Sequence, residues 1–302
     1  MSAFRNDTRL RFFADPGEFL ACAGAHLAAA PVVNTAVTTT AHRSVAQLAA
    51  GVPLPAHHWW LAVGDESDAV VGAAMRASNS VPYPLFLLPM PDGAAVALAR
   101  ALHERGEEVL GVNGVLPTAE LCVAELARLG GGRVEVRRQT MLYELGELNP
   151  PAPVPGRLVP ATVDDLALAA RWSAAFVGDA DEQAGRLTHG SMPEMADPAE
   201  VRRRLQAGRL WFWVDGSGAP VHLIGCHPPS FGAARVGPVY TPPEQRGRGW
   251  AANAVAEVSR RVQAGGARAC LFTDQANPTS NRLYAALGYR PVAELANFVI
   301  SR

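Results

Sequence analysis

The second half of the chain alternates short apolar runs with segments of helical periodicity. The segment "TVDDLALAARWSAAF" places apolar residues at helical spacing, and "RLWFWV" and "APVHLIGC" are compact apolar runs around a Gly-Ser-Gly turn at 216–218. The run "ARVGPVY" predicts a third strand, which Gly237-Pro238 interrupts. Because proline cannot donate to a strand ladder, this strand should be bulged or splayed from one neighbour.

The pattern continues with a helix, a strand, a second helix and a last strand. Ala251, Val255, Val258 and Val262 share one face of a helix that should stop at Gly265-Gly266. "ACLFT" predicts a buried strand, "NPTSNRLYAALG" a short helix with Gly288 past its end, and "ANFVI" a final strand. This order predicts an α/β (α+β) domain, in which helices flank a mixed, partly parallel central sheet.

The first half repeats this order in a weaker form, which predicts an internal duplication and two tandem copies of the fold. "FLLPMPDGAAVALARALHERG" resembles "PVYTPPEQRGRGWAANAVAEVSRRVQAGG", and an apolar strand reaches Pro-acid in both, at Pro91-Asp92 and Pro243-Glu244. The segment "GELNPPAPVPG" has four prolines and cannot continue a helix or a central strand. We therefore expect one domain over residues 1–148, a proline-rich linker over 149–156, and a second domain over 157–302.

Composition narrows the class of protein. The chain has 302 residues, of which 49% are hydrophobic and 18% charged, and its formal charge is −1, so we expect a compact chain with no electrostatic preference for nucleic acid or an anionic membrane. The N-terminus lacks the apolar core of a signal peptide, and runs such as "PLFLLPM" are too short to cross a bilayer, so we expect a cytoplasmic protein.

The cysteines and histidines do not predict a metal site. Four widely spaced cysteines without a CxxC pair indicate buried free thiols in a reducing compartment, namely Cys22, Cys122, Cys226 and Cys270. His57 and His58 are adjacent rather than four residues apart, and no HExxH motif occurs.

The stretch "TPPEQRGRGWAANAV" carries the clearest chemistry. Gly247 and Gly249 can adopt positive φ and let the backbone approach a ligand closely. Successive N–H groups at a helix start form an anion site that the helix dipole reinforces, and Arg246 and Arg248 add positive charge. The stretch therefore predicts a pyrophosphate cradle.

Three other interpretations of this loop compete. "GRGWAA" matches the dinucleotide pattern, but Pro242 to Gln245 intervene after the strand and only about fifty residues follow, too few for a full doubly wound fold. An RNA-binding RGG segment would need repeats in a disordered setting. An ordinary glycine-containing surface loop is the third interpretation, and the loop alone does not exclude it.

The surroundings of the loop resemble the GNAT superfamily of acyl-CoA-dependent N-acetyltransferases. Arg246-x-x-Gly249-x-Ala251 follows a proline-interrupted strand, and "NPTSNRLYAALGYRP" follows the next strand. The resemblance covers about Arg235 to Val292 in its motifs and the second half in element order, while the first half matches only as a degenerate copy without the Arg-Gly-Arg-Gly insert. It implies acetyl-CoA as cofactor, a pantetheine cleft beside the splayed strand, and a catalytically silent first half.

The resemblance also assigns roles residue by residue. Backbone groups of Val239 and Thr241, with Tyr240 between them, would contact pantetheine. The pyrophosphate would lie on Arg246 and the N–H groups of Gly247, Arg248, Gly249, Trp250, Ala251 and Ala252. Asn277 and Asn281 would hold the cofactor arm, and Tyr284 would lie at the thioester sulfur. Three of these residues have a structural alternative: Asn277 could only cap its helix, Tyr284 could be a core residue, and Arg248 could be solvated.

The substrates define the expected mechanism. A primary amine has a pKa near 10, so about one molecule in a thousand is neutral at pH 7 and a base must take its proton. We expect direct transfer in a ternary complex, with Tyr284 as the acid and Glu182 or His227 as candidate bases. The acceptor amine is not specified, and a monomer or homodimer is expected. A non-catalytic CoA-binding regulatory or structural protein is the alternative. Mycothiol synthase has a similar half-degenerate duplication, but its motif details differ.

Overall fold

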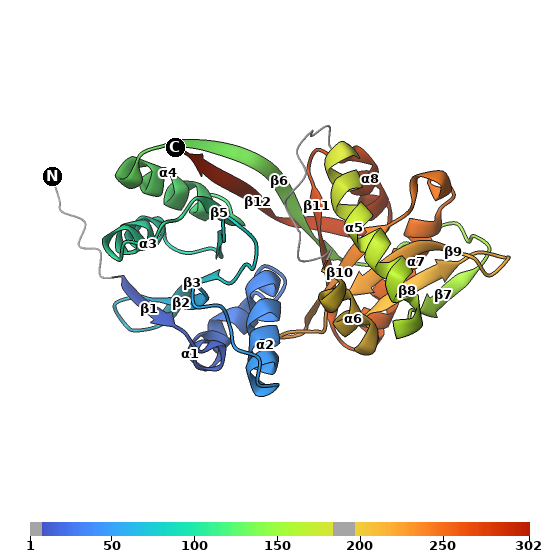
Figure 1. Cartoon of the computed structure of the whole chain (residues 1–302), viewed down its shortest axis with the longest axis horizontal. Coiled ribbons are helices and arrows are strands. Elements are labelled where there is room, and N and C mark those ends of the chain that lie inside the picture. Colours follow the sequence, from blue (N-terminus) through green and yellow to red (C-terminus); the bar gives the residue numbers. More distant parts are fainter. Residues whose placement is uncertain (1–7, 184–196) are drawn as a thin grey trace. The chain divides into compact units, whose positions relative to one another are not determined.

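The computed structural model describes residues 8–183 and 197–302 (Figure 1). Two compact units divide the chain. Unit 1 runs up to Met141 and also includes Ala293–Arg302, whereas unit 2 comprises Leu142–Val292.

Unit 1 is a mixed sheet with helices on both faces. Its sheet order is β1-β2-β3-β4-β5-β12-β6, in which β4 and β5 are parallel and β12 is antiparallel to β5. The strands are β1 (Arg9–Phe13), β2 (Trp59–Gly64), β3 (Val70–Arg76), β4 (Leu85–Leu87), β5 (Gly111–Val115), β6 (Arg133–Leu145) and β12 (Tyr289–Ser301). The helices are α1 (Pro16–Ala29), α2 (Thr35–Ala49), α3 (Asp92–Glu104) and α4 (Thr118–Gly130).

Unit 2 has the same kind of sheet. Its order is β11-β10-β9-β8-β7, beginning beside the end of β6, and β10 and β11 are parallel. The strands are β7 (Arg157–Pro160), β8 (Leu210–Val214), β9 (Pro220–Cys226), β10 (Ala233–Tyr240) and β11 (Arg268–Asp274). The helices are α5 (Leu166–Gln183), α6 (Pro198–Gln206), α7 (Trp250–Ala264) and α8 (Pro278–Ala286), with 3-10 turns η1 (Val163–Asp165) and η3 (Pro243–Gln245).

Among the described residues, the elements from β1 to β6 and those from β7 to β12 repeat one order: strand, two helices, three strands, helix, strand, helix, strand. The hairpins β2–β3 and β8–β9 share a turn in detail. Asp65 accepts hydrogen bonds from the backbone and hydroxyl of Ser67 and from Ala69 N, and Asp215 accepts the equivalent three bonds from Ser217 and Ala219. The predicted fold class, a mixed and partly parallel sheet present twice, is confirmed.

The last strand of the chain belongs mainly to unit 1. Leu295 to Val299 pair with β5, and Phe298 is buried in the core of unit 1. The proline-rich segment 149–156 packs on unit 2, since Trp213 Nε1 donates to Pro155 O at 3.1 Å and Val154 contacts the core. The contacts thus divide the chain earlier than the expected boundary at residue 148. The expected pairing of one silent and one catalytic domain stays a prediction.

Two clusters of buried side chains cover the two faces of the unit 2 sheet. Trp213, Ile224 and Cys226 lie on the face covered by α7 and α8. Phe212 and Leu223 lie on the opposite face, with α5 and α6. Successive strand residues point to opposite faces, so the strand sequences set which side chains can meet each helix pair.

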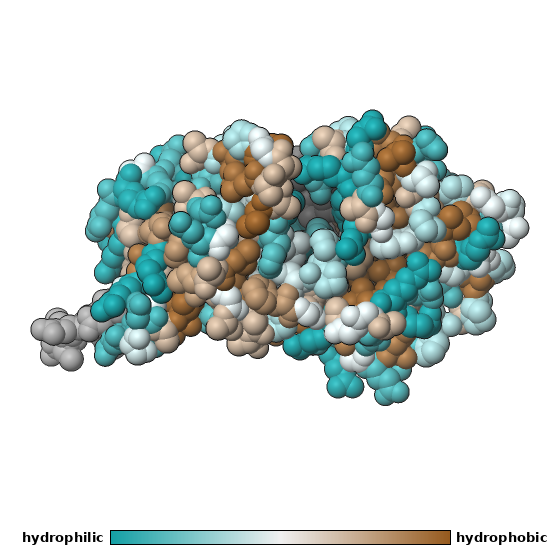
Figure 2. All heavy atoms as spheres, turned by 90° about the horizontal axis from the view of Figure 1, so that it is seen from below, coloured by the Kyte–Doolittle hydropathy of each residue, from teal (hydrophilic) through white to brown (hydrophobic). Residues whose placement is uncertain are grey.

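The expectations about the surface and the cysteines are met only in part. Hydrophilic and hydrophobic residues are intermixed over the face drawn in Figure 2. None of the helices in the described ranges is long and apolar enough to span a membrane. All four cysteines are free, but Cys22 is only half-buried on α1, so the expectation that all four are buried is wrong for this one.

Candidate active site

Strands β10 and β11 of unit 2 are paired over only part of their length. Their parallel pairing ends at Arg235↔Cys270, although β11 continues to Asp274. On its other side β10 stays paired with β9, with a register shift between Val236 and Val239. The shift falls at Gly237-Pro238, so the expected bulge and splay are both confirmed at the predicted place.

The backbone N–H and C=O of Val239 point away from β9, toward the side on which β11 has separated. Its partner on β9 is Ile224, which also pairs with Trp211 on β8, and Cys226 N donates to Arg209 O on that same side. Hydrogen-bonding direction alternates along a strand, so Ile224 bonds to β8 and Val239 is turned away from β9. Thr241 follows the same alternation, whereas Tyr240 bonds toward β9 and buries its ring on the face of α5.

The loop after β10 leads to a helix start without a side-chain cap. Gly247 and Gly249 have φ of 76° and 81°, as expected, and Gly249 is the N-cap of α7. A Cβ on Gly249 would lie 3.0 Å from Val154 Cγ1, while space around Gly247 is open. Since no side chain caps α7, the N–H groups of its first turn, from Trp250 on, can serve an external anion.

Arg246 is held in place by contacts within unit 2. Its Nε donates to Thr241 O at 3.1 Å and its Nη2 contacts Asp179 Oδ2 at 2.5 Å. The Tyr240 hydroxyl donates to the same carboxylate oxygen at 3.1 Å. Burial and the charge of Asp179 raise the pKa of Tyr240 to about 12. Arg248 is exposed and donates to Glu244 O at 3.3 Å, which leaves its charge at the surface of the loop.

The two asparagines differ in what they bind. Asn277 caps α8, because its carboxamide oxygen accepts a hydrogen bond from Ser280 N at 3.0 Å. This oxygen therefore has the capping role that was the structural alternative for Asn277. Asn281 Nδ2 donates to Asp274 O at 3.1 Å and to Gln275 O at 3.2 Å, which ties α8 to the end of β11. Its Oδ1 is buried and finds no hydrogen-bond donor among the described residues, so this oxygen can accept a bond from a ligand.

Tyr284 is buried in the core between α8 and the sheet of unit 2. It belongs to the same cluster as Val236 and Leu271, and its ring meets Tyr289 edge to face at a centroid distance of 5.9 Å. Burial raises the pKa of Tyr284 well above the usual range of a phenol. The hydroxyl is therefore protonated at neutral pH and can donate a hydrogen bond. Trp250, which also lies in this cluster, fills the core under the loop.

The candidate bases are less clearly placed. Arg235 Nη2 lies 3.3 Å from His227 Nε2, and because a guanidinium can only donate, this nitrogen of His227 accepts. Its lone pair is therefore engaged by Arg235 in this structure. Glu182 lies in the last turn of α5, and its side chain falls outside the described part of the chain.

A histidine on β9 that the sequence patterns did not single out contacts the residue that follows β10. His222 is fully buried on β9, and its Nδ1 lies 2.7 Å from Thr241 Oγ1. Burial lowers the pKa of His222 to about 3, so the ring is neutral. The only sequence signal was a titratable residue inside an apolar run, "VHLIGC".

In unit 1, the strands that correspond to β10 and β11 are β4 and β5, and they stay paired. Its β4 pairs with β5 as far as its last residue, Leu87↔Gly114, and a Cβ on Gly114 would lie 2.5 Å from Leu87 O. The register between β3 and β4 runs without a shift over Ala74↔Leu87 and Met75↔Phe86. Helix α3 begins at Asp92, directly after Pro91, without the Arg-Gly-Arg-Gly insert. Unit 1 thus lacks the strand separation and the register shift that are found in unit 2.

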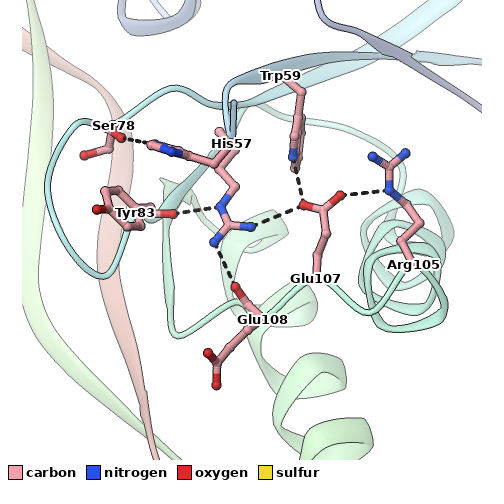
Figure 3. A network of polar contacts seen from close by, with 8 residues as sticks. His57, Trp59, Ser78, Tyr83, Arg105, Glu107 and Glu108 are labelled. Atoms are coloured by element: carbon pink, nitrogen blue, oxygen red, sulfur yellow. Dashed lines mark hydrogen bonds and ion pairs between the residues drawn. The ribbon is translucent and has the colours of Figure 1, made fainter. Parts of the chain in front are cut away.

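The main polar cluster of unit 1 is a set of structural contacts (Figure 3). Arg76 donates to Tyr83 O at 3.2 Å, to Glu107 Oε2 at 3.2 Å and to Glu108 O at 2.8 Å. Glu107 also accepts from Trp59 Nε1 at 2.9 Å and pairs with Arg105. Each charge thus has a partner, and the contacts fix β3 to the segment before β5. No group of three or more potential metal ligands occurs in the described ranges.

Comparison with known proteins agrees with this geometry. Residues 226–297 match the protein-family model described as FR47-like protein. No curated protein sequence matches the chain. A GCN5-related N-acetyltransferase from Sphaerobacter thermophilus is similar in structure, with a TM-score of 0.58 and 18% identity over 98% of this chain and 96% of that one.

Two further solved structures resemble the chain over nearly their full lengths. A GNAT-family acetyltransferase from Colwellia psychrerythraea has a TM-score of 0.56 and 13% identity, covering 97% of this chain and 100% of that one. A tandem GNAT protein from the clavulanic acid biosynthesis pathway has a TM-score of 0.52 and 17% identity, covering 96% of this chain and 98% of that one. At such identities the similarity establishes the fold.

Proposed function

Because the chain has the fold of the GNAT superfamily, we propose that it is an N-acetyltransferase that moves the acetyl group of acetyl-CoA directly to an amine. The observation that carries this proposal is the separation of β10 from β11 after Arg235, in a strand whose following loop ends at the uncapped start of α7. A fold alone does not specify a reaction, so the proposal depends on this site.

The residues at the end of β10, in the following loop and on α8 fit coenzyme A. The pyrophosphate would lie on the first N–H groups of α7, between Gly247 and Ala252, with Arg246 and Arg248 beside it. The backbone of Val239 and the free Oδ1 of Asn281 supply an edge and an acceptor for the amides of pantetheine. Asn277 contributes by fixing the start of α8, which carries Tyr284.

When bound, acetyl-CoA supplies an activated thioester, whose carbonyl carbon gains a bond to the amine nitrogen as its bond to sulfur breaks and the sulfur gains a proton. Tyr284 would donate a hydrogen bond at the sulfur. Burial raises the pKa of Tyr284. A thiol has a pKa of about 8.5, and each pKa unit by which Tyr284 exceeds this value adds about 1.4 kcal/mol to the free energy of complete proton transfer from the phenol to the thiolate. Its role is therefore better described as donating a hydrogen bond than as losing its proton outright.

A base must take the proton from the amine. Glu182 and His227 remain the proposed candidates. The contact between Arg235 and His227 Nε2 argues against His227 in this arrangement, because the lone pair that would accept the proton is already engaged. In unit 1, the closed strand pair and the absent insert support a silent role.

One alternative has an observation in its favour. Tyr284 packs in the core against Tyr289, which a non-catalytic CoA-binding protein with an eroded acceptor site would also retain. Both proposals require coenzyme A to bind once per chain, in unit 2. They differ in whether an amine is consumed.

The test is a screen of amines with acetyl-CoA, in which release of the CoA thiol and formation of the amide are both measured. We expect at least one amine to be acetylated by the full chain, and calorimetry to give one CoA site per chain. Binding of CoA without turnover of any amine would favour the non-catalytic alternative. Failure to bind CoA would refute both.

A further inference from the structure

Resting on the proposed function, we propose that Asn253 is a positioning residue of the cofactor site and that the proline-rich segment 149–156 forms one wall of that site. Asn253 is half-buried at the end of the first turn of α7. Its side chain sets the direction of a backbone N–H that the pyrophosphate would use. The proline-rich segment, which the sequence indicates only as a boundary, thereby takes part in binding coenzyme A.

The carboxamide of Asn253 donates to two backbone carbonyl groups. Its Nδ2 lies 3.0 Å from Ala152 O in the proline-rich segment and 3.1 Å from Gly249 O in the proposed cofactor loop. Both partners can only accept, so the amide nitrogen must face them rather than the amide oxygen. Asn253 and Ala152 are 101 residues apart in the sequence, and this one side chain therefore joins the loop to a distant segment.

The bond to Gly249 O fixes the orientation of a peptide group. The same oxygen also accepts from Asn253 N at 3.2 Å. Gly249 O and Trp250 N–H belong to one peptide unit, and in a trans peptide these two groups point in opposite directions. Because the oxygen is held toward the helix, the Trp250 N–H is held outward, at the end of α7 that no side chain caps. Glycine can adopt many conformations, so these two bonds restrict a residue that would otherwise turn readily.

The proline-rich segment is itself held against this helix start. Val154 packs on the core of unit 2, and its Cγ1 would lie 3.0 Å from a Cβ on Gly249. The next residue, Pro155, accepts a hydrogen bond from Trp213 Nε1 at 3.1 Å through its carbonyl. The segment thus has fixed neighbours on both the helix and the sheet, and it presents to Asn253 a carbonyl whose position is set.

The described part of unit 1 has no counterpart of this amide at the corresponding position. Its α3 has Pro91 as N-cap where α7 has Gly249, and the fourth residue of the helix is Ala95 where α7 has Asn253. Ala95 is fully buried and its methyl group cannot donate a hydrogen bond. The amide therefore occurs at the helix start that follows the Arg-Gly-Arg-Gly insert, as expected of a residue that serves the cofactor.

The test compares two amide side chains on the same helix. Gln263 Nε2 donates to Gly146 O at 3.1 Å, so Gln263→Ala removes a similar bond at the far end of α7 and is the matched control for Asn253→Ala. We expect Asn253→Ala to weaken CoA binding in calorimetry about tenfold and Gln263→Ala to leave it unchanged. In steady-state kinetics, Asn253→Ala should raise KM for acetyl-CoA about tenfold and keep kcat within a factor of about two, because the pyrophosphate is remote from the thioester.

Pantetheine, which lacks the pyrophosphate, distinguishes positioning from general disruption of the site. Its affinity, measured by displacement of CoA, should be the same in Asn253→Ala and wild type. Asn253→Asp keeps the shape of the side chain but cannot donate at pH 7, so it should weaken CoA binding at least as much, and it replaces the alanine variant if that variant does not fold.

Two results would overturn this inference alone. One is wild-type affinity for CoA in a folded variant at position 253, and the other is an equal loss of affinity for CoA and for pantetheine. A wild-type protein that does not bind CoA would overturn the proposed function and this inference with it.

Discussion

The imidazole Nδ1 of His222 lies 2.7 Å from the hydroxyl oxygen of Thr241, and this contact joins the fully buried part of β9 to the residue at which β10 ends. Thr241 also accepts a hydrogen bond from Arg246 Nε through its carbonyl. His222 therefore stabilises the start of the proposed cofactor loop through its contact with Thr241. In unit 1 the residue at the corresponding place after the shared hairpin turn is Gly72, where a Cβ would lie 2.3 Å from Met90 Cβ.

His222 predicts a loss of stability in acid. Its pKa is about 3 in the folded chain and 6.5 in the unfolded chain, so below pH 6.5 only the unfolded chain binds the proton. Stability from this group is complete above pH 6.5 and falls as the pH approaches 3, by about 2 kcal/mol at pH 5. Urea unfolding of wild type and His222→Gln at pH 7 and pH 5 should show this difference in pH dependence.

The control for this prediction is His103→Gln, which removes an exposed histidine on α3. It should keep the pH dependence of the wild type. If His222→Gln kept it as well, the neutral buried state of His222 would be disproved. His58, whose pKa is lowered to about 4 mainly by burial, is present in all three proteins and cancels in the comparison.

Much of the fold could be predicted because its signals are local. The interruption at Gly237-Pro238 lies in the strand itself, so the loss of a backbone donor predicted the bulge. The stops at Gly265 and Gly288 were visible as glycines after helical runs. The placement of β12 could not be predicted, because nothing in "ANFVI" specifies which strand it pairs with, and its partner β5 lies some 180 residues away along the chain.

The conformation of the candidate site was predictable where the backbone defines it. The positive φ of Gly247 and Gly249 follows from residue type and loop setting. The contacts of Arg246 with Asp179, and of His222 with Thr241, join residues far apart in sequence, and each depends on tertiary packing.

The loop provides a prediction about cofactor affinity. Gly249→Val should weaken CoA binding about a hundredfold, or by 2–3 kcal/mol, through loss of one or two charge-assisted bonds. A side chain at φ 81° is strained, and its Cβ would press on Val154, so the helix start must move. Calorimetry with CoA measures the change. Gly208→Val, at φ 63° in an exposed turn outside the loop, is the control and should bind CoA normally. Normal affinity in a folded Gly249→Val protein would refute the cradle.

The pairing of β12 with β5 predicts that a residue near the C-terminus stabilises unit 1. Phe298 pairs with Val112 and is buried in the unit 1 core, so Phe298→Ala should cost about 3–5 kcal/mol. Hydrogen exchange should become faster in β4 and β5 and change little in β9 and β10, and CoA affinity should be retained. Glu294→Ala, an exposed change on the same strand, is the control. Faster exchange confined to unit 2 would contradict the assignment of β12.

Tyr284→Phe should lower turnover about a hundredfold or more while CoA affinity stays within a factor of about two. The ring and its edge contact with Tyr289 remain, so packing beside Val236 is kept and only the hydroxyl is lost. Because burial raises the pKa of Tyr284, the hydroxyl stays protonated from pH 6 to 9, and the pH–rate profile should fall in height without changing shape.

The matched control is Tyr289→Phe, which removes a buried hydroxyl that lies 2.7 Å from Ser259 Oγ and should reduce stability by about 1 kcal/mol without a comparable loss of turnover. Steady-state kinetics with any amine found in the screen, beside calorimetry with CoA, measures both effects. Equal turnover in Tyr284→Phe and wild type would make Tyr284 a core residue only, and the sulfur would then require another hydrogen-bond donor.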